Sequence, residues 1–259
     1  VNALSEWLEI EIYKDGDIYT QRFERGNIKT NLEIVGKTEK TGTLVRFKPD
    51  AEIFKETTEF DFEILKTRLR EQAFLNAGIH IQISDERDPD HIICENFCYE
   101  GGISSFVEYL NKKKAVELVH PDIIHFSTVA DDDQATAEVA MQYNDSYNEL
   151  ILSFANNIHT TDGGTHEEGF KRSLTRVMND YARKYNLLKD SDKNLTGDDV
   201  REGLTVVISI KVKDAQFEGQ TKAKLGNTEI SGLVSNMMND KLSTYLEENP
   251  ATARAIFDK

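Results

Sequence analysis

The sequence is poor in cysteine and has no long apolar run. Its two cysteines, Cys94 and Cys98, lie with His91 in the segment HIICENFC. Three such ligands are one short of a closed tetrahedral zinc site, so we expect no metal centre. The alternation in IICENFCYE predicts a strand with both cysteines on one face, which we interpret as buried, reduced thiols of a cytoplasmic protein. No apolar stretch approaches the roughly 20 residues that cross a bilayer, so no membrane span is expected.

Positive charge is also scarce. The formal net charge of -15 at pH 7 argues against a surface that binds nucleic acid throughout, although it leaves room for a local basic patch. The chain opens with VNALSEWLEI, which has no initiator methionine, basic n-region or small-residue cleavage site. We therefore expect no secretory signal, and we expect a fragment of a longer protein that starts partway through a helix.

The composition is that of a folded protein. Hydrophobic residues make up 39% and charged residues 30% of the 259 residues, which is too apolar for a disordered chain. The length favours two domains, and the charged turn DERDPDH followed by GGISSFVEYLN suggests a boundary near residue 98. Because strands and helices follow one another in irregular order, we predict an α+β fold with domains at 1–98 and 99–259.

The first part is predicted to form strands around one helix. Asp15-Gly16 joins two alternating runs, which is a strong hairpin signal. Residues 42–50 and the segment IHIQISDER are predicted as further strands. The helix between them should have Thr58 and Asp61 as a capping box and Gly78 after its end. Its apolar face contains Phe62, Leu65, Leu69 and Ala73.

The second part mixes helices and strands. GGISSFVEYLN begins a helix, and three strands follow, DIIHFSTV, ATAEVAMQY and NELILSFANNI, the latter two joined across Asn144-Asp145. A long helix over 167–186 and the strand LTVVISIKV come next. A last helix over 228–248 should end at Asn249-Pro250, because the residue before a proline disfavours the helical conformation.

The segment DGGTHEEGFKR contains parts of two catalytic motifs and completes neither. Phe170 stands where a phosphate-binding P-loop needs lysine, and also where a zinc metalloprotease needs its second histidine. The paired glycines permit a tight turn instead, and Thr165 with Glu168 predicts a capping box for the helix that follows.

The helix over 167–186 has an apolar face and a basic face. Arg172, Arg176 and Arg183 lie on the basic face. It is either a solvated surface with ion pairs or a lining for nucleic acid, because guanidinium groups bind phosphate well. The apolar stripe, which we expect to face the core, contains Phe170, Leu174, Val177, Met178, Tyr181 and Tyr185.

A polar loop, QFEGQTKAKLGN, separates the last predicted strand from the last predicted helix. Lys222 and Lys224 in this loop could simply face water. Alternatively, Gly219 and Gly226 would let a ligand approach the backbone, and an ammonium group beside an amide donor suits a terminal phosphate. The chemistry of the loop alone leaves both interpretations open.

Eight segments together give the chain a resemblance to the B subunits of bacterial DNA gyrase and, more loosely, of topoisomerase IV. They occur in the order found in that family and cover essentially the whole chain. The segments are VNALS, EKTGTLVRFKPD, LREQAFLNAGI, YEGGISSFVEYLN, SFANNIHTTDGGTHEEGF, TGDDVREGLTVVISIKV, QFEGQTKAKLGN and LEENPATARAIFDK.

The resemblance implies a fold and an activity. The first domain would be the distal part of a GHKL ATPase sandwich like that of Hsp90 and MutL, and the second a transducer resembling domain 2 of ribosomal protein S5. In this family ATP and Mg²⁺ are cofactors, and ATP closes two B subunits into a homodimer that surrounds DNA. The implied enzyme is an ATP-hydrolysing type II DNA topoisomerase that negatively supercoils DNA together with the A subunit of gyrase.

The resemblance also implies functional residues. Gln220, Thr221 and Lys222 match a loop that reaches the ATP site, where the lysine contacts the terminal phosphate. Thr43 matches a threonine near the adenine, and Val45 matches a residue that lines this pocket and the adjoining site of aminocoumarin-type inhibitors. The arginine face fits a basic transducer cavity that holds DNA.

Some features of the family are missing from this sequence. Lys14 stands where the family often has an arginine, which places a bidentate contact there in doubt. The catalytic glutamate, the magnesium-binding asparagine and the adenine-binding aspartate precede VNALS in the family. We therefore expect this chain by itself neither to hydrolyse ATP nor to bind it tightly.

Three alternative hypotheses remain at this point. The first is the B subunit of topoisomerase IV, because the sequence does not separate the two enzymes securely. The second is a non-catalytic interaction module with a DNA-binding surface. The third is a metallohydrolase built on His159, His166 and Glu167.

Overall fold

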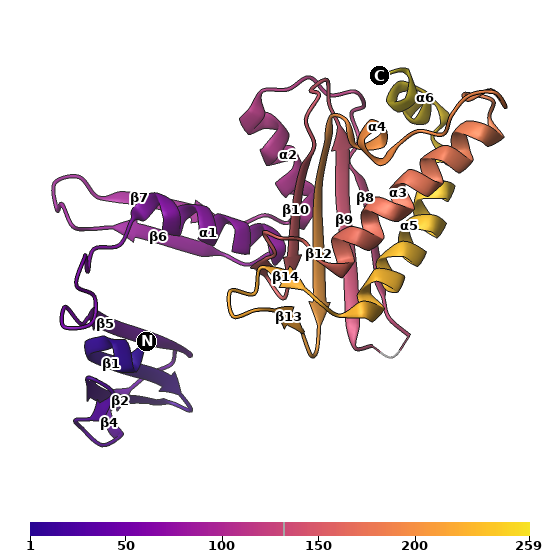
Figure 1. Cartoon of the computed structure of the whole chain (residues 1–259). Coiled ribbons are helices and arrows are strands. Elements are labelled where there is room, and N and C mark those ends of the chain that lie inside the picture. The colour runs from indigo at the N-terminus through magenta and orange to yellow at the C-terminus, as the bar shows by residue number, and fades with distance from the viewer. Residues whose placement is uncertain (132) are drawn as a thin grey trace. The chain divides into compact units, whose positions relative to one another are not determined.

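The computed structural model describes residues 1–131 and 133–259, which form two compact units, Val1–Leu65 and Lys66–Lys259 (Figure 1). Helices and strands alternate irregularly along the chain, which confirms the predicted α+β class. The predicted domain boundary at residue 98 falls inside the second unit, because Phe74 and Leu75 belong to a buried cluster of that unit. As an assignment of domains, this boundary stays a prediction.

The first unit is an antiparallel sheet with the strand order β3-β2-β1-β5, in which β4 also pairs with β2. The predicted hairpin is confirmed, since Asp15 and Gly16 connect β1 to β2 with φ angles of 54° and 85°. Two left-handed residues give a turn whose twist matches that of the strands. The elements are η1 Asn2–Leu4, β1 Ser5–Lys14, β2 Asp17–Glu24, β3 Asn27–Ile28, β4 Glu33–Lys37 and β5 Gly42–Pro49.

The next helix begins later than its predicted cap. The Oδ1 atom of Asp61 accepts a hydrogen bond from the Ile64 N–H at 2.9 Å, so Asp61 caps the helix. The predicted capping box that starts at Thr58 is therefore wrong. A two-stranded hairpin follows the helix. These elements are α1 Phe62–Leu75, β6 Ile81–Asp85 and β7 Ile93–Phe97.

Neither cysteine is buried, which corrects the prediction of buried thiols. Cys94 is exposed and Cys98 is half-buried. Cys94 lies on β7, where Gln82 of the paired strand β6 is 3.2 Å from its Sγ atom. The alternation correctly indicated a strand, but a two-stranded ribbon supplies too few neighbours to bury both of its faces.

A five-stranded sheet forms the centre of the second unit, in the order β11-β10-β12-β9-β8 (Figure 1). The central strand β12 runs parallel to β10 and antiparallel to β9. Every residue of β12 except Lys211 is buried, which explains its nearly continuous apolar sequence. The strands are β8 Ile124–Val129, β9 Ala135–Tyr143, β10 Leu150–Ala155, β11 Ile158–His159 and β12 Leu204–Val212.

Asn144 and Asp145 connect β9 to β10, as predicted, but these two strands are not neighbours. Strand β12 lies between them. Asn144 is instead an anchor, because its N–H donates to the Gly203 carbonyl at 2.9 Å and its side-chain amide donates to Asn111 at 3.2 Å and Thr205 at 3.1 Å. The most apolar strand thus takes the central place, where both faces of the sheet are covered.

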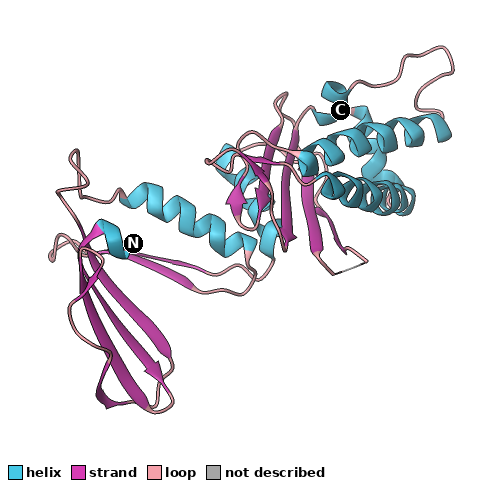
Figure 2. Cartoon of the chain, turned by 60° about the horizontal axis from the view of Figure 1, so that its bottom comes forward, coloured by secondary structure: helices cyan, strands magenta, loops and turns pink. Residues whose placement is uncertain are grey.

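Helices cover both faces of this sheet. Helices α3 and α5 pack together on one face, and α2 lies on the other (Figure 2). Successive residues of β12 alternate between the two cores, with Val206 facing α3 and α5 and Val207 facing α2. Helix α6 was not predicted. The helices are α2 Gly102–Lys114, α3 Thr165–Lys184, α4 Gly197–Arg201, α5 Thr228–Glu248 and α6 Pro250–Asp258.

Both ends of α3 differ from the prediction. Gly164 is the N-cap and no side chain caps the helix, so the capping box of Thr165 and Glu168 is wrong. At the other end Tyr185 is 45% exposed, because the helix stops before it, whereas the remaining residues of the apolar stripe are buried as expected. Among the described residues, no helix combines the length and apolar character needed to cross a membrane.

Candidate functional site

The predicted phosphate contacts lie at the tip of a short hairpin formed by β13 Phe217–Glu218 and β14 Lys224–Leu225. Gln220, Thr221 and Lys222 are all exposed there. Lys222 has a left-handed φ of 56°, and its N–H reaches the Gly219 carbonyl at 3.4 Å. The tip is therefore a tight turn whose polar side chains face solvent.

The two lysines of this loop differ in their contacts. Lys224 forms an ion pair with Glu218 at 3.2 Å. Lys222 has no carboxylate partner among the residues that the structure describes, and its Nζ atom lies 6.0 Å from the centre of the Phe217 ring. An ammonium group without a carboxylate partner is free to bind an anion, so the geometry favours Lys222 over Lys224 as a phosphate contact.

The base of the hairpin is bonded to the turn that precedes α3. The Asp162 N–H donates to the Ala223 carbonyl at 2.9 Å, and the Leu225 N–H donates to the Gly163 carbonyl at 3.1 Å. Gly164 and Leu225 also form an isolated parallel bridge. We call residues 162–164 the seat of the Lys222 loop.

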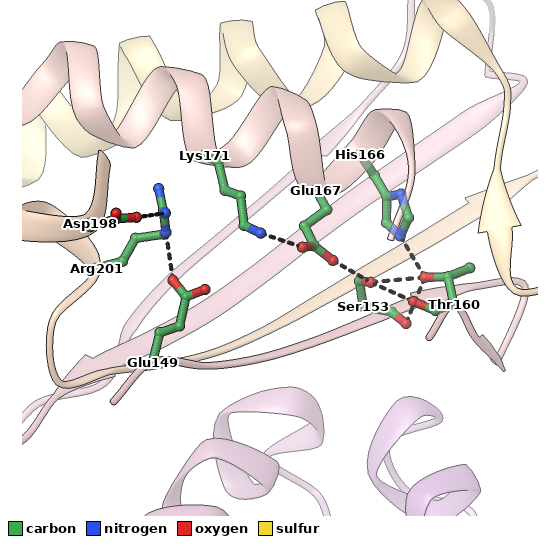
Figure 3. A network of polar contacts seen from close by, with 8 residues as sticks. All are labelled: Glu149, Ser153, Thr160, His166, Glu167, Lys171, Asp198 and Arg201. Atoms are coloured by element: carbon green, nitrogen blue, oxygen red, sulfur yellow. Dashed lines mark hydrogen bonds and ion pairs between the residues drawn. The ribbon is translucent and has the colours of Figure 1, made fainter. Parts of the chain in front are cut away.

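The seat is connected through Thr160 to a polar network, which Figure 3 shows. Ser153 donates to Glu167 at 3.0 Å, and Lys171 forms an ion pair with the same carboxylate at 2.6 Å. The Thr160 hydroxyl lies 2.8 Å from the Ser153 carbonyl oxygen and 3.0 Å from His166 Nε2, so it links the histidine to β10.

His166 is a structural histidine rather than a metal ligand. It is fully buried, and burial lowers its pKa to about 4, so the ring is neutral near pH 7. His159 is stacked on the Phe154 ring with a centroid distance of 5.0 Å. Across residues 1–131 and 133–259, no group of three His, Cys, Asp or Glu side chains is arranged to hold a metal ion, which is against the metallohydrolase hypothesis.

The three predicted arginines do not form one surface. Arg172 donates to the Ser231 hydroxyl at 2.6 Å, and Arg176 pairs with Asp180 at 3.6 Å. Both line a groove between α3 and α5 that also contains Ser173, Gly232, Ser235, Asn236 and Asn239.

Arg183 has a different set of contacts. Its guanidinium donates to the carbonyls of Lys189 and Asp192 and to the side chain of Asn194. These bonds hold the loop that follows α3. A ligand bound in the groove between α3 and α5 could therefore contact Arg172 and Arg176 but not Arg183.

Thr43 and Val45 lie on β5 of the first unit, opposite Ile12 and Ile10 of β1. Directly paired residues point to the same side of a sheet, so these four side chains share one face. Val45 is 49% exposed, and Thr43 is exposed as well. Thr43 and Val45 therefore belong to the first unit, and the residues of the Lys222 loop belong to the second.

The sequence did not reveal the contacts that hold the site. The seat was interpreted only as a tight turn, although its paired glycines were the available signal. Nothing in the sequence pointed to Leu225 as the partner of Gly164, or to Ser153 and Thr160 as supports of His166, because these contacts join distant segments.

Comparisons with known proteins agree with these observations. A family model described as DNA gyrase B matches residues 102–259. Over its whole length the chain is 52% identical to the B subunit of DNA gyrase from Clostridium acetobutylicum, and it covers 40% of that protein. The chain thus spans less than half the length of this relative.

Two solved structures resemble nearly the whole chain. The 43K ATPase domain of Thermus thermophilus gyrase B, in complex with an aminocoumarin, has a TM-score of 0.85 and 37% identity, with 99% of this chain and 68% of that one covered. The topoisomerase IV ATP-binding domain of Francisella tularensis, in complex with a small-molecule inhibitor, has a TM-score of 0.80 and 30% identity, with the same two coverages of 99% and 68%. The TM-score and the sequence identity are both higher for the gyrase structure than for the topoisomerase IV structure.

Proposed function

This chain belongs to the DNA gyrase B family, and we propose that it forms the distal ATPase region and the transducer of the B subunit of a DNA gyrase. In the intact protein it would serve an ATP-dependent type II topoisomerase that negatively supercoils DNA in the cytoplasm. The partners would be DNA, the A subunit of gyrase and a second copy of the intact protein. The transducer would couple ATP binding and hydrolysis to the closure of the dimer around DNA.

The observation that carries this proposal is the exposed Lys222 at the tip of an anchored loop. Its ammonium group has no carboxylate partner among the described residues and suits the terminal phosphate of ATP. There it would stabilise the negative charge that builds up as the bond to this phosphate breaks. Gln220 and Thr221 would flank the phosphate.

Thr43 and Val45 of the first unit are proposed to take part in nucleotide binding in the intact protein. Thr43 would lie near the adenine, and Val45 would line the pocket that also takes aminocoumarin-type inhibitors in the intact protein. The described residues contain no cluster of three carboxylate or imidazole groups for a metal ion. Binding of Mg²⁺ is therefore proposed for the intact protein and not for particular residues of this chain.

Substitution of Lys222 in the full-length protein tests the proposal. With DNA and the A subunit of gyrase present, Lys222→Ala should lower ATP turnover and supercoiling together. Lys224→Ala is the matched control, because Lys224 is engaged with Glu218, and it should retain both activities. Unchanged ATP turnover in Lys222→Ala would contradict the proposal, whereas this chain by itself should show no turnover.

A second function, duplex DNA binding by the groove between α3 and α5, is favoured by the positions of Arg172 and Arg176. Guanidinium groups that contact phosphate make the affinity depend on salt. Fluorescence anisotropy with a labelled duplex should show weaker binding and a smaller salt dependence after both arginines are changed to alanine. Arg183→Ala should have little effect, and the absence of DNA binding at low salt would argue against this function.

A further inference from the structure

The position of Lys222 is set at the base of its loop and not at its tip. Among the described residues, the tip from Gly219 to Lys222 has one backbone hydrogen bond, the bond between these two residues at 3.4 Å. The base has two hydrogen bonds to the seat, and one of them comes from the N–H of the buried Leu225. A movement of β14 would therefore carry Lys222 with it.

Gly164 is the residue of the seat that lets β14 approach closely, because it has no side chain. Its φ of +133° is rarely adopted by residues with side chains. A Cβ atom built on Gly164 would lie 2.4 Å from the carbonyl oxygen of Leu225 and 2.5 Å from its nitrogen. Because both atoms belong to the backbone, only a displacement of β14 or of the seat could relieve this contact.

The seat itself is held in place by buried groups, which contact it through Thr160. The Gly163 N–H donates to the Thr160 carbonyl at 2.9 Å. The hydroxyl of Thr160 joins His166 to Ser153, and all three of these side chains are buried. When a methyl group is added at Gly164, the contact with Leu225 must open, and because Thr160 and His166 hold the seat, part of the displacement should fall on β14.

We propose that Gly164 is a positioning residue for Lys222. Its close approach to Leu225 sets where the ammonium group meets the terminal phosphate, and this inference rests on the function proposed above for Lys222. A displacement of about 1 Å at a reacting centre can cost about a hundredfold in rate. A methyl group at Gly164 would act through such a displacement, without touching the nucleotide.

The test is a double-mutant cycle in the full-length protein, assayed with DNA and the A subunit of gyrase. Lys222→Ala should lower kcat for ATP by about a hundredfold, as the loss of a preorganised charge contact does. Gly164→Ala should lower kcat by about tenfold or more. The double variant should be no slower than Lys222→Ala. The affinity for ADP, which has no γ-phosphate, should be unchanged in all three.

Two results would overturn the inference in different ways. If the two effects multiply in the double variant, Gly164 acts independently of Lys222, and only the positioning role is lost. If Lys222→Ala has normal turnover, the proposed function fails, and the inference fails with it. The control is Gly36→Ala in the first unit, whose added Cβ would meet only the end of the flexible Ile18 side chain, at 3.3 Å, and should leave turnover unchanged.

Thr160→Val decides the question if Gly164→Ala does not fold, as judged by circular dichroism. This variant removes the hydroxyl that joins His166 to Ser153 and loosens the seat without adding bulk. We expect a several-fold loss of kcat with unchanged ADP affinity, no further loss on the Lys222→Ala background, and recovery in Thr160→Ser. Wild-type turnover in Thr160→Val would overturn the inference.

Discussion

Protonation of His166 should destabilise the second unit as the pH falls. Burial lowers the pKa of this imidazole from its ordinary 6.5 to about 4, although Glu167 acts in the opposite direction. The folded protein therefore keeps His166 neutral, while the unfolded chain binds a proton below about pH 6.5. The contribution of the neutral ring to stability is complete above that pH and is lost as the pH falls toward 4.

The size of the effect follows from the two pKa values. Their difference of about 2.5 units amounts to about 3.4 kcal/mol below pH 4, at about 1.36 kcal/mol per unit. At pH 5 the His166 ring is still mostly neutral in the folded protein and mostly protonated in the unfolded chain. The free energy of unfolding is therefore about 2 kcal/mol lower than at pH 7. Burial also lowers the pKa of His120, which adds a loss in the same direction.

The variant that tests this is His166→Gln, whose side-chain amide can take the place of Nε2 beside Thr160 but does not titrate. Urea unfolding followed by far-ultraviolet circular dichroism at pH 7 and pH 5 gives the free energy of unfolding of both proteins. Between these pH values the wild-type protein should lose about 2 kcal/mol more than the variant. The fluorescence of Trp7, the single tryptophan, reports on the first unit and should not differ between them.

Equal losses in the two proteins would contradict the prediction, because the proton taken up on unfolding would then not belong to His166. A variant that is less stable by the same amount at both pH values would have lost packing but kept the same pH dependence, which also contradicts the prediction. His120→Gln is the matched comparison, since it removes the other buried histidine whose pKa is lowered.

Two further predictions concern α3. Gly169→Ala should reduce the free energy of unfolding by about 1–3 kcal/mol in urea, because the new Cβ would lie 2.6 Å from the Ser231 carbonyl oxygen of α5. Gly232→Ala, where a Cβ meets nothing within 4 Å, should be neutral or slightly stabilising, and an equal loss in both variants would contradict the packing argument. Arg183→Ala should speed proteolytic cleavage of the loop 189–194, because it removes the hydrogen bonds that hold that loop. An unchanged cleavage rate would show that other contacts hold the loop.

Elements with a strong local pattern could be predicted from the sequence. The last long helix was predicted at 228–248 and α5 has these bounds, because an apolar periodicity and Pro250 mark it locally. The hairpin at Asp15-Gly16 was likewise found, since its turn needs particular residues. The strand LTVVISIKV was recognised, although its central place between β9 and β10 was not. Strand order depends on contacts between distant segments, which no local pattern records.

The candidate site was predictable to the same degree. The exposure of Lys222 could be expected from a polar loop between glycines. The difference between Lys222 and Lys224 was not visible, because it depends on the ion pair of Lys224 with Glu218. Arg183 was grouped with Arg172 and Arg176 by helical spacing alone, whereas its actual contacts lie in the loop beyond the helix.

The central position of β12 has a consequence for the synthesis of this protein. Strands β8, β9 and β10 leave the ribosome before Leu204–Val212, yet β12 must pair with both β9 and β10. Until that segment emerges, the inner edges of β9 and β10 have no partner within the sheet, and both cores lack their central strand. Unpaired apolar edges are prone to aggregate. The nascent chain is therefore most vulnerable while the segment between β10 and β12 is being translated.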